Sequence, residues 1–179
     1  HEVVGEVTAV GEDVSGLSAG DVGVVYSYLT CRECEFCLTG RGNLCVNLKR
    51  IGFELDGGFS EFLRIPAHNF CPFDQRLAAH EMAIVADAIG TSYHAITGLA
   101  GVKPGQDVLI VGAGGLGIHA VQIAKLCGAN VFVADMDPQA LDLARQFGAD
   151  HTLLPADAPQ GIQDLTGGSG VNAVIEVVG

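Results

Sequence analysis

From residue 107 onward, short apolar segments alternate with helical ones, and this alternation constrains the fold more than any other feature. The expected strands are residues 107–111, 130–135, 151–154 and 172–178, and the expected helices are residues 115–128 and 137–149. Asp137 and Pro138 suit the N-cap and the first position of the second helix. This order favours a parallel, doubly wound sheet of the α/β class, with four strands instead of the roughly six of a complete dinucleotide-binding fold.

A glycine pattern lies between the first of these strands and the helix that follows it. Gly112, Gly114 and Gly117 form G-x-G-x-x-G. In this context the first glycine allows a tight turn, the second lets a pyrophosphate approach the backbone, and the third lets helix and strand pack closely. The helix N-terminus adds amide donors and a favourable dipole. We therefore predict a dinucleotide site that includes Gly115 and Leu116, against the alternative of a glycine-rich turn that binds nothing.

An acidic residue, Asp135, ends the next strand. A carboxylate at this position accepts hydrogen bonds from the adenosine ribose hydroxyls and repels the 2′-phosphate of NADP. The surrounding sequence "ADMDP" contains two aspartates and no Arg or Lys. The sequence therefore predicts NAD as the cofactor.

The first part of the chain has a different character. Residues 1 to about 75 contain β-branched and aromatic runs, "VVGEVTAVG", "DVGVVYSYLT" and "GGFSEFLRIP", which are broken by Gly, Asp and Pro and are typical of strands. Residues 76–101 are Ala-rich and predict a helix that breaks at Gly90 and restarts at Thr91.

Four of the six cysteines interrupt the β-rich part with the spacing C-x2-C-x2-C-x7-C, at Cys31, Cys34, Cys37 and Cys45. Disulfides are rare in the reducing compartment that we expect, and a thioredoxin-like pair needs only one C-x-x-C at a helix start. Four thiolates suit tetrahedral zinc and leave no open position for a substrate. We therefore favour a structural zinc site, with an iron–sulfur cluster as the main alternative.

The charge balance disfavours two classes of partner. The 179 residues carry 9 Lys and Arg against 21 Asp and Glu, a formal net charge of −12. Nucleic acid and anionic membrane surfaces are therefore not expected to bind. No apolar run approaches the roughly 20 residues of a membrane span and no signal peptide is visible, so we expect a cytoplasmic protein. Because the chain starts without Met and stops in a strand, we expect an internal fragment of a longer protein.

The β-rich first half, the four-cysteine segment (the cysteine lobe) and the G-x-G-x-x-G pattern (the fingerprint) together resemble the zinc-dependent medium-chain dehydrogenase/reductase family, the alcohol dehydrogenases. "HEVVGEVTAVGEDV" is similar to the Gly-His-Glu segment of that family, "GGFSEFLRIPA" to its return strand, "ADAIGTSYHAI" to its interdomain helix and "IEVVG" to its fourth nucleotide strand. The resemblance implies a GroES-like β domain over residues 1–88, with a structural-zinc lobe at residues 30–50, and a Rossmann NAD-binding domain over residues 89–179. Both domains are expected to be incomplete.

The resemblance also implies a second, catalytic zinc. His1 matches the histidine ligand of the family, Asp87 matches a ligand position where many relatives carry cysteine, and Glu2 matches a neighbouring glutamate that supports or exchanges with the ligands. The remaining ligand, an upstream cysteine, is expected outside the chain. By the same resemblance, Thr91, Val177 and Val178 line the nicotinamide pocket. Without it, His1 reads as a terminal residue and Asp87 as a helix cap or an exposed carboxylate.

The implied reaction is hydride transfer between an alcohol and NAD, which gives an aldehyde or ketone. The partners implied are a small-molecule alcohol or carbonyl compound and further copies of the chain, in a dimer or tetramer. Two alternatives stay open: a zinc-free quinone or enoyl reductase of the same superfamily, and a non-enzymatic module that binds zinc and NAD.

Overall fold

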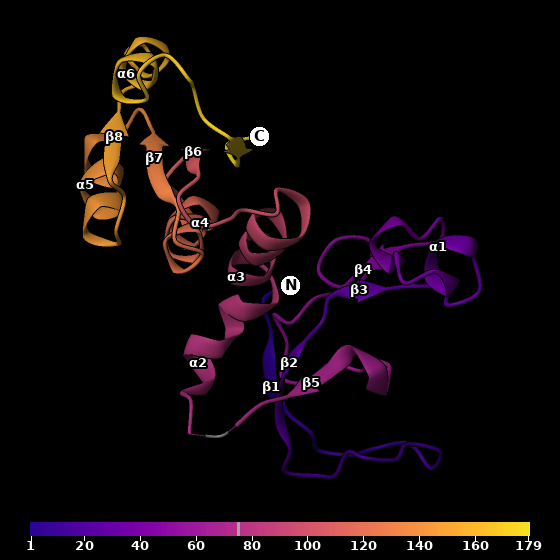
Figure 1. Cartoon of the computed structure of the whole chain (residues 1–179). Helices are drawn as coiled ribbons and strands as arrows, with labels where there is room; N and C mark the ends of the chain where they lie inside the picture. Colours follow the sequence, from indigo (N-terminus) through magenta and orange to yellow (C-terminus); the bar gives the residue numbers. More distant parts are fainter. Residues whose placement is uncertain (75) are drawn as a thin grey trace. The chain divides into compact units, whose positions relative to one another are not determined.

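The computed structural model describes residues 1–74 and 76–179, and it divides into two compact units, His1–Asp87 and Ala88–Gly179 (Figure 1). The predicted domain boundary, between residues 88 and 89, stays a prediction.

The second unit contains a four-stranded parallel sheet in the order β8-β7-β6-β9. The strands are β6 (Asp107–Val111), β7 (Asn130–Ala134), β8 (His151–Leu153) and β9 (Ala173–Glu176). Three helices alternate with them: α4 (Gly115–Leu126), α5 (Pro138–Gln146) and α6 (Ala158–Leu165). All four predicted strands and both predicted helices are present, and Asp137 caps α5 by accepting a hydrogen bond from the Gln139 N–H.

Helices cover both faces of this sheet, and β7 shows how the sequence produces that arrangement. Successive side chains of a strand point to opposite faces. Val131 and Val133 belong to a core that includes residues of α4 and α5, whereas Phe132 and Ala134 belong to a second core with Ala158 and Ile162 of α6. Since four of the five β7 residues, Val131 to Ala134, are buried, the strand is a nearly continuous apolar run, as expected for a strand inside a parallel sheet.

The first unit is built from short antiparallel strands. β1 (Val4–Glu6), β2 (Val22–Val25) and β5 (Phe70–Pro72) form one sheet in the order β1-β2-β5, and β3 (Tyr28–Leu29) pairs with β4 (Lys49–Arg50) in a second. The short helices α1 (Glu35–Leu38), η1 (Gly42–Leu44) and η2 (Ala67–Asn69) complete the β-rich part. Asn69 links its strands, because its buried side-chain amide donates hydrogen bonds to the carbonyl oxygens of Tyr26 and Tyr28.

The strand predicted over residues 57–66 is wrong, since these residues form bends and irregular backbone. A strand exists only where its N–H and C=O groups pair with a neighbour, and this segment pairs with no strand in the described chain. Its aromatic side chains Phe59 and Phe62 are exposed.

The helix break predicted at Gly90 is also wrong. The Ala-rich segment contains α2 (Ala79–Met82), the 3-10 turn η3 (Ala83–Ala86), α3 (Ala88–Tyr93) and the π-helical η4 (His94–Leu99). Gly90 lies inside α3, and the chain departs from helical geometry at Asp87, where φ is −127° and ψ is −72°. A single glycine within a helix costs only about 1 kcal/mol, which neighbouring contacts readily offset. Among the described helices, none combines the length and apolar character needed to cross a lipid bilayer.

Phe132 tests the packing of the sheet, because its side chain is fully buried between β7 and α6. We expect Phe132→Ala in the full-length protein to lower the free energy of unfolding by about 3–5 kcal/mol, measured by urea denaturation. The matched control is Val174→Ala on β9, where the side chain is exposed and the change should stay within about 0.5 kcal/mol. Equal effects of the two substitutions would contradict the assignment of Phe132 to the core.

Candidate functional site

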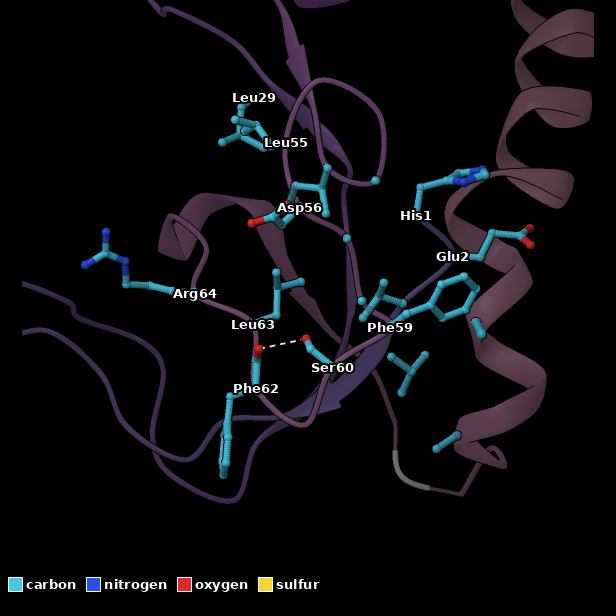
Figure 2. A pocket seen from close by; sticks show the side chains of 18 of the residues that line it. His1, Glu2, Leu29, Leu55, Asp56, Phe59, Ser60, Phe62, Leu63 and Arg64 are labelled. Atoms are coloured by element: carbon cyan, nitrogen blue, oxygen red, sulfur yellow. Dashed lines mark hydrogen bonds between the residues drawn. The ribbon is translucent and has the colours of Figure 1, made fainter.

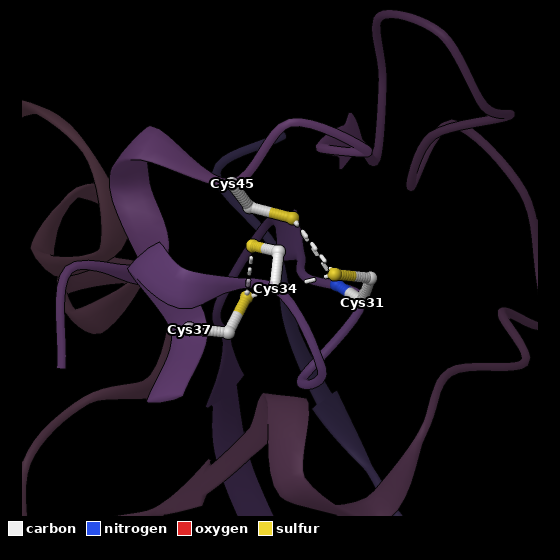
Figure 3. Close-up of side chains that lie close together, drawn as sticks. All are labelled: Cys31, Cys34, Cys37 and Cys45. Atoms are coloured by element: carbon white, nitrogen blue, oxygen red, sulfur yellow. Dashed lines mark hydrogen bonds between the residues drawn. The ribbon is translucent and has the colours of Figure 1, made fainter. Parts of the chain in front are cut away.

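The four cysteines of the predicted zinc lobe come together in space (Figure 3). Their sulfur atoms all lie within 4.8 Å of one another, and the closest pairs are 3.5 Å apart. A disulfide would bring two sulfurs to about 2.05 Å, so none of these pairs is bonded. Metal–sulfur bonds of about 2.3 Å in a tetrahedron separate the ligand sulfurs by about 3.8 Å. The observed spacing therefore fits a tetrahedral four-thiolate metal site.

Local backbone geometry aims these sulfurs at a common centre. Arg32 adopts the left-handed conformation, with φ of 62°, and turns the chain between Cys31 and the start of α1. Cys34 stands at the N-cap position of α1, and Cys37 lies within the single turn of this helix, with its sulfur 3.5 Å from the Cys34 sulfur. The Cys31 N–H donates to the Cys45 sulfur over 3.3 Å, which joins the two ends of the lobe.

Backbone amides of the lobe also shift the pKa values of the thiols. Backbone N–H groups of Cys37 and Val46 lower the pKa of Cys34 to about 6, and the Cys31 N–H lowers the pKa of Cys45. Loss of hydration and its thiol neighbours raise the pKa of Cys37 to about 11. Because a metal binds the thiolate form, metal uptake at this site releases protons and strengthens as the pH rises.

A second pair of predicted ligands also meets. His1 Nε2 lies 3.0 Å from Asp87 Oδ2, although the two residues are 86 positions apart in the sequence. Both side chains remain about one-third exposed, so the pair is open to a ligand. Within residues 1–74 and 76–179, the four cysteines are the one group of three or more such ligands, so Glu2 does not complete a three-ligand set with His1 and Asp87.

His1 and Glu2 border an open cavity of about 1230 Å³ in the first unit (Figure 2). Its wall is mixed, with apolar side chains such as Leu29, Leu55 and Leu63 beside the charged groups of Asp56 and Arg64. The non-strand segment 57–66 supplies a large part of this wall.

The glycine fingerprint adopts the conformation that its pattern predicts. Gly112 has φ of 96°, in the left-handed region that favours glycine. A Cβ atom at Gly117 would lie 1.9 Å from the carbonyl oxygen of Gly112, so only glycine lets α4 approach the loop this closely. A Cβ at Gly114 or Gly115 would meet no atom within 4 Å. The loop is therefore tight on its inner side and open where the first-turn amides of α4 need an outside partner.

Asp135 has a contact that sequence reasoning missed. Its carboxylate accepts a hydrogen bond from the Ala113 N–H at 2.6 Å and another from the Asp137 N–H at 2.8 Å. These backbone donors hold the pKa of the Asp135 carboxyl below its ordinary value, and the Asp137 N–H has the largest effect. The group is therefore ionised at neutral pH. Three backbone N–H groups, of Asp137, Ala113 and Met136, act on a carboxylate that has about four acceptor sites, so room remains for a hydroxyl ligand. Asp135 thus fixes the fingerprint loop to the end of β7 while it stays able to bind.

Two further residues hold the predicted cofactor loop and carried no recognisable sequence signal. Ser92, buried in α3 next to Thr91, donates a hydrogen bond to the Leu116 carbonyl over 2.8 Å. Glu176 accepts a hydrogen bond from the Val178 N–H at 2.6 Å. Val178 in turn lies against the loop, since a Cβ at Gly112 would be 2.8 Å from the Val178 side chain. The Val177 side chain lies near Gly117.

Comparison with known proteins gives consistent matches along the chain. Residues 1–75 match the model of the alcohol dehydrogenase GroES-like domain, and residues 115–179 match that of the zinc-binding dehydrogenases. An alcohol dehydrogenase of Geobacillus stearothermophilus is 39% identical over 99% of this chain and 53% of its own length. An L-threonine 3-dehydrogenase of Symbiobacterium thermophilum is 34% identical over 100% of this chain and 51% of its own. The chain therefore spans about half the length of the curated relatives it matches.

Solved structures agree with these matches. The alcohol dehydrogenase of Aeropyrum pernix has a TM-score of 0.90 and 36% identity, over 100% of this chain and 54% of its own. A cobalt- and zinc-bound thermostable alcohol dehydrogenase of Pyrobaculum aerophilum has a TM-score of 0.84 and 32% identity, over 97% of this chain and 51% of its own.

The fingerprint loop offers a matched pair of substitutions in the full-length protein. Gly117→Ala should lower the melting temperature, because the added methyl group collides with the Gly112 carbonyl. Gly115→Ala, in the same helical turn, should leave it unchanged or raise it, because the methyl group meets open space and alanine favours the helix. Differential scanning calorimetry measures both, and equal melting temperatures for the two variants would refute the close approach.

Proposed function

The chain belongs to the zinc-dependent medium-chain dehydrogenase/reductase family, and we propose that it forms about half of an enzyme that transfers hydride between an alcohol and NAD. The predicted fold class, a GroES-like β domain followed by a Rossmann sheet, is confirmed. The contact between His1 and Asp87 carries the functional proposal, because it brings together two potential ligands that the sequence places far apart.

The four-cysteine lobe binds a structural zinc ion in this proposal. Its support is the sulfur spacing, which suits a tetrahedral ion, and the donor set, which four thiolates already complete. A closed ligand shell leaves no position for a substrate. The lobe therefore serves the fold and takes no part in the chemistry.

The catalytic zinc is held by His1, Asp87 and a ligand outside the chain, with Glu2 beside them. Such an ion supplies Lewis acidity that lowers the pKa of a bound alcohol. The role of the chain is positional: His1 and Asp87 present one nitrogen and one oxygen from separate segments, and their partial exposure leaves room for the substrate oxygen.

The cofactor of the proposal is NAD. The open first turn of α4, with Gly114, Gly115 and Leu116, receives the pyrophosphate, and Asp135 accepts hydrogen bonds from the ribose hydroxyls. Thr91, Val177 and Val178 line the nicotinamide pocket. The fixed position of Val178 against the loop supports this role, since a rigid wall is needed to hold the ring in place.

The substrate is a small alcohol, or the aldehyde or ketone formed from it. Relatives that match the chain are described as alcohol, L-threonine 3- and L-galactonate-5-dehydrogenases, so the hydroxyl group is what their substrates share.

We also propose a cytoplasmic homo-oligomer, a dimer or tetramer, which rests on the family resemblance and the acidic composition. A zinc-free quinone reductase and a non-enzymatic module are both disfavoured by the alcohol dehydrogenase relatives and the cysteine cluster.

The central test is made on the full-length protein. We expect two zinc ions per chain by elemental analysis and alcohol-dependent formation of NADH. His1→Ala should remove one zinc ion and the activity, because it deletes a metal ligand. His68→Ala, which replaces another exposed histidine of the first unit, should keep both. Full activity of the His1 variant would refute the proposed catalytic site.

Cofactor choice gives an independent test. The ionised Asp135 should repel the 2′-phosphate of NADP, so kcat/KM should favour NAD by about tenfold or more, equivalent to at least about 1.4 kcal/mol. Asp135→Asn should narrow this ratio, because it removes the charge and keeps the size of the side chain. A kcat/KM with NADP that equals that with NAD in the unsubstituted protein would contradict the prediction.

A further inference from the structure

The turn that follows β4 packs against His1, and its tip carries an exposed aromatic residue, Phe53. The ring centroids of Phe53 and His1 lie 4.9 Å apart, with the planes tilted by 50°. Phe53 is 55% exposed, and its ring contacts the His1 imidazole and the Arg50 guanidinium. We propose that Phe53, clamped by an ion pair of Arg50 and Glu54, is a positioning residue that orients the His1 imidazole for metal binding.

The backbone of this turn is well fixed. The Arg50 carbonyl accepts hydrogen bonds from the N–H groups of Phe53 and Leu55, and the Gly52 N–H donates to the Leu55 carbonyl. The turn is anchored to the body of the first unit through Ile51, whose side chain is buried and whose N–H donates to the Ser27 carbonyl. A turn held at both its base and its closing bonds gives its tip residue a defined position.

Arg50 and Glu54 then fix the Phe53 ring. The Arg50 Nε and Nη2 atoms both donate to the Glu54 carboxylate, over 3.1 and 2.5 Å, and the Arg50 N–H donates to the same carboxylate over 2.8 Å. Bidentate pairs of this kind hold the guanidinium plane in one orientation. Its central carbon lies 4.5 Å from the Phe53 ring centroid, within the range of a cation–π contact.

The imidazole of His1 is thereby held on two sides. Its ring contacts Phe53, while its Nε2 atom faces the Asp87 carboxylate at 3.0 Å. The turn also lies close to the backbone of His1, since a Cβ at Gly52 would be 3.1 Å from the His1 nitrogen. Histidine ligands depend on such neighbours for the ring orientation that a metal requires.

This inference rests on the proposed function, because it assigns to the His1–Asp87 pair the role of metal ligands. It goes beyond that function by adding Phe53, Arg50 and Glu54. In the contacts described above, these residues act on the His1 ring and on one another and are not metal ligands. Their effect should therefore appear in metal retention and in the geometry around His1, while the four-cysteine site is left unchanged.

The test follows the loss of zinc from the full-length protein to a coloured chelator. Phe53→Leu keeps an apolar side chain and removes the ring, and we expect its zinc at the His1 site to bind about tenfold more weakly. Phe53→Tyr should restore wild-type retention, because it keeps the ring. Glu54→Gln should weaken retention in the same direction, since it loosens Arg50. Phe147→Leu, a half-exposed phenylalanine of the second unit, is the matched control and should behave as the wild type.

The outcomes separate the inference from the function on which it rests. His1→Ala identifies the zinc ion that belongs to the His1 site, and a wild-type protein that lacks this ion overturns the proposed function together with the inference. If the ion is present and Phe53→Leu retains it as the wild type does, the inference alone is overturned. Loss of the four-cysteine zinc or a lower melting temperature in Phe53→Leu would show a general structural role and would also overturn it. Wild-type retention in Glu54→Gln would remove the ion pair from the proposal.

Discussion

The second unit depends on the distance between the α4 backbone and the loop that precedes it. Gly117 lets this helix pass so close to the Gly112 carbonyl that any side chain would collide with it. The approach allows α4 to pack on β6 and β7 in a core of small and branched side chains, such as Ala120, Val121 and Val108. It also leaves the first-turn amides pointing outward. One steric constraint therefore serves both the packing of the sheet and the binding of an anion.

The first unit is stabilised in a different manner. Few of its side chains are fully buried, and its strands are only two to four residues long. Specific polar links replace a large apolar core here: the Asn69 amide joins two strand ends, the four thiols close the lobe, and Arg50 with Glu54 closes a turn. Structural metals and such links are common where apolar burial is small.

The parts of the structure that the sequence predicted are those governed by local patterns. The apolar strands, the G-x-G-x-x-G turn and the Asp137 cap each depend on residues close in the chain, and each is present. The cysteine spacing likewise predicted a cluster. The resemblance, and not the local pattern, singled out His1 and Asp87 as a pair. Their roles, and those of the other predicted site residues, stay predictions.

The failures have a common physical cause, which is dependence on distant neighbours. The segment 57–66 has the composition of a strand, but strand formation needs a pairing partner that composition does not reveal. Glycine at position 90 favours a helix break, but α3 continues through this residue because it is supported by tertiary contacts with α4. The Asp135 contact with Ala113 and the Phe53 contact with His1 join residues 22 and 52 positions apart, and no local pattern encodes them.

The two-sided burial of β7 has a consequence for how this unit tolerates change. Val131 and Val133 serve one core, and Phe132 and Ala134 serve the other. Conservative exchanges within either set keep each side chain in its own layer. An inserted or deleted residue moves every following side chain to the opposite face, which places the phenyl ring where a smaller group belongs. Sequence drift in this strand should therefore proceed by replacement, while length variation is confined to the loops at its ends.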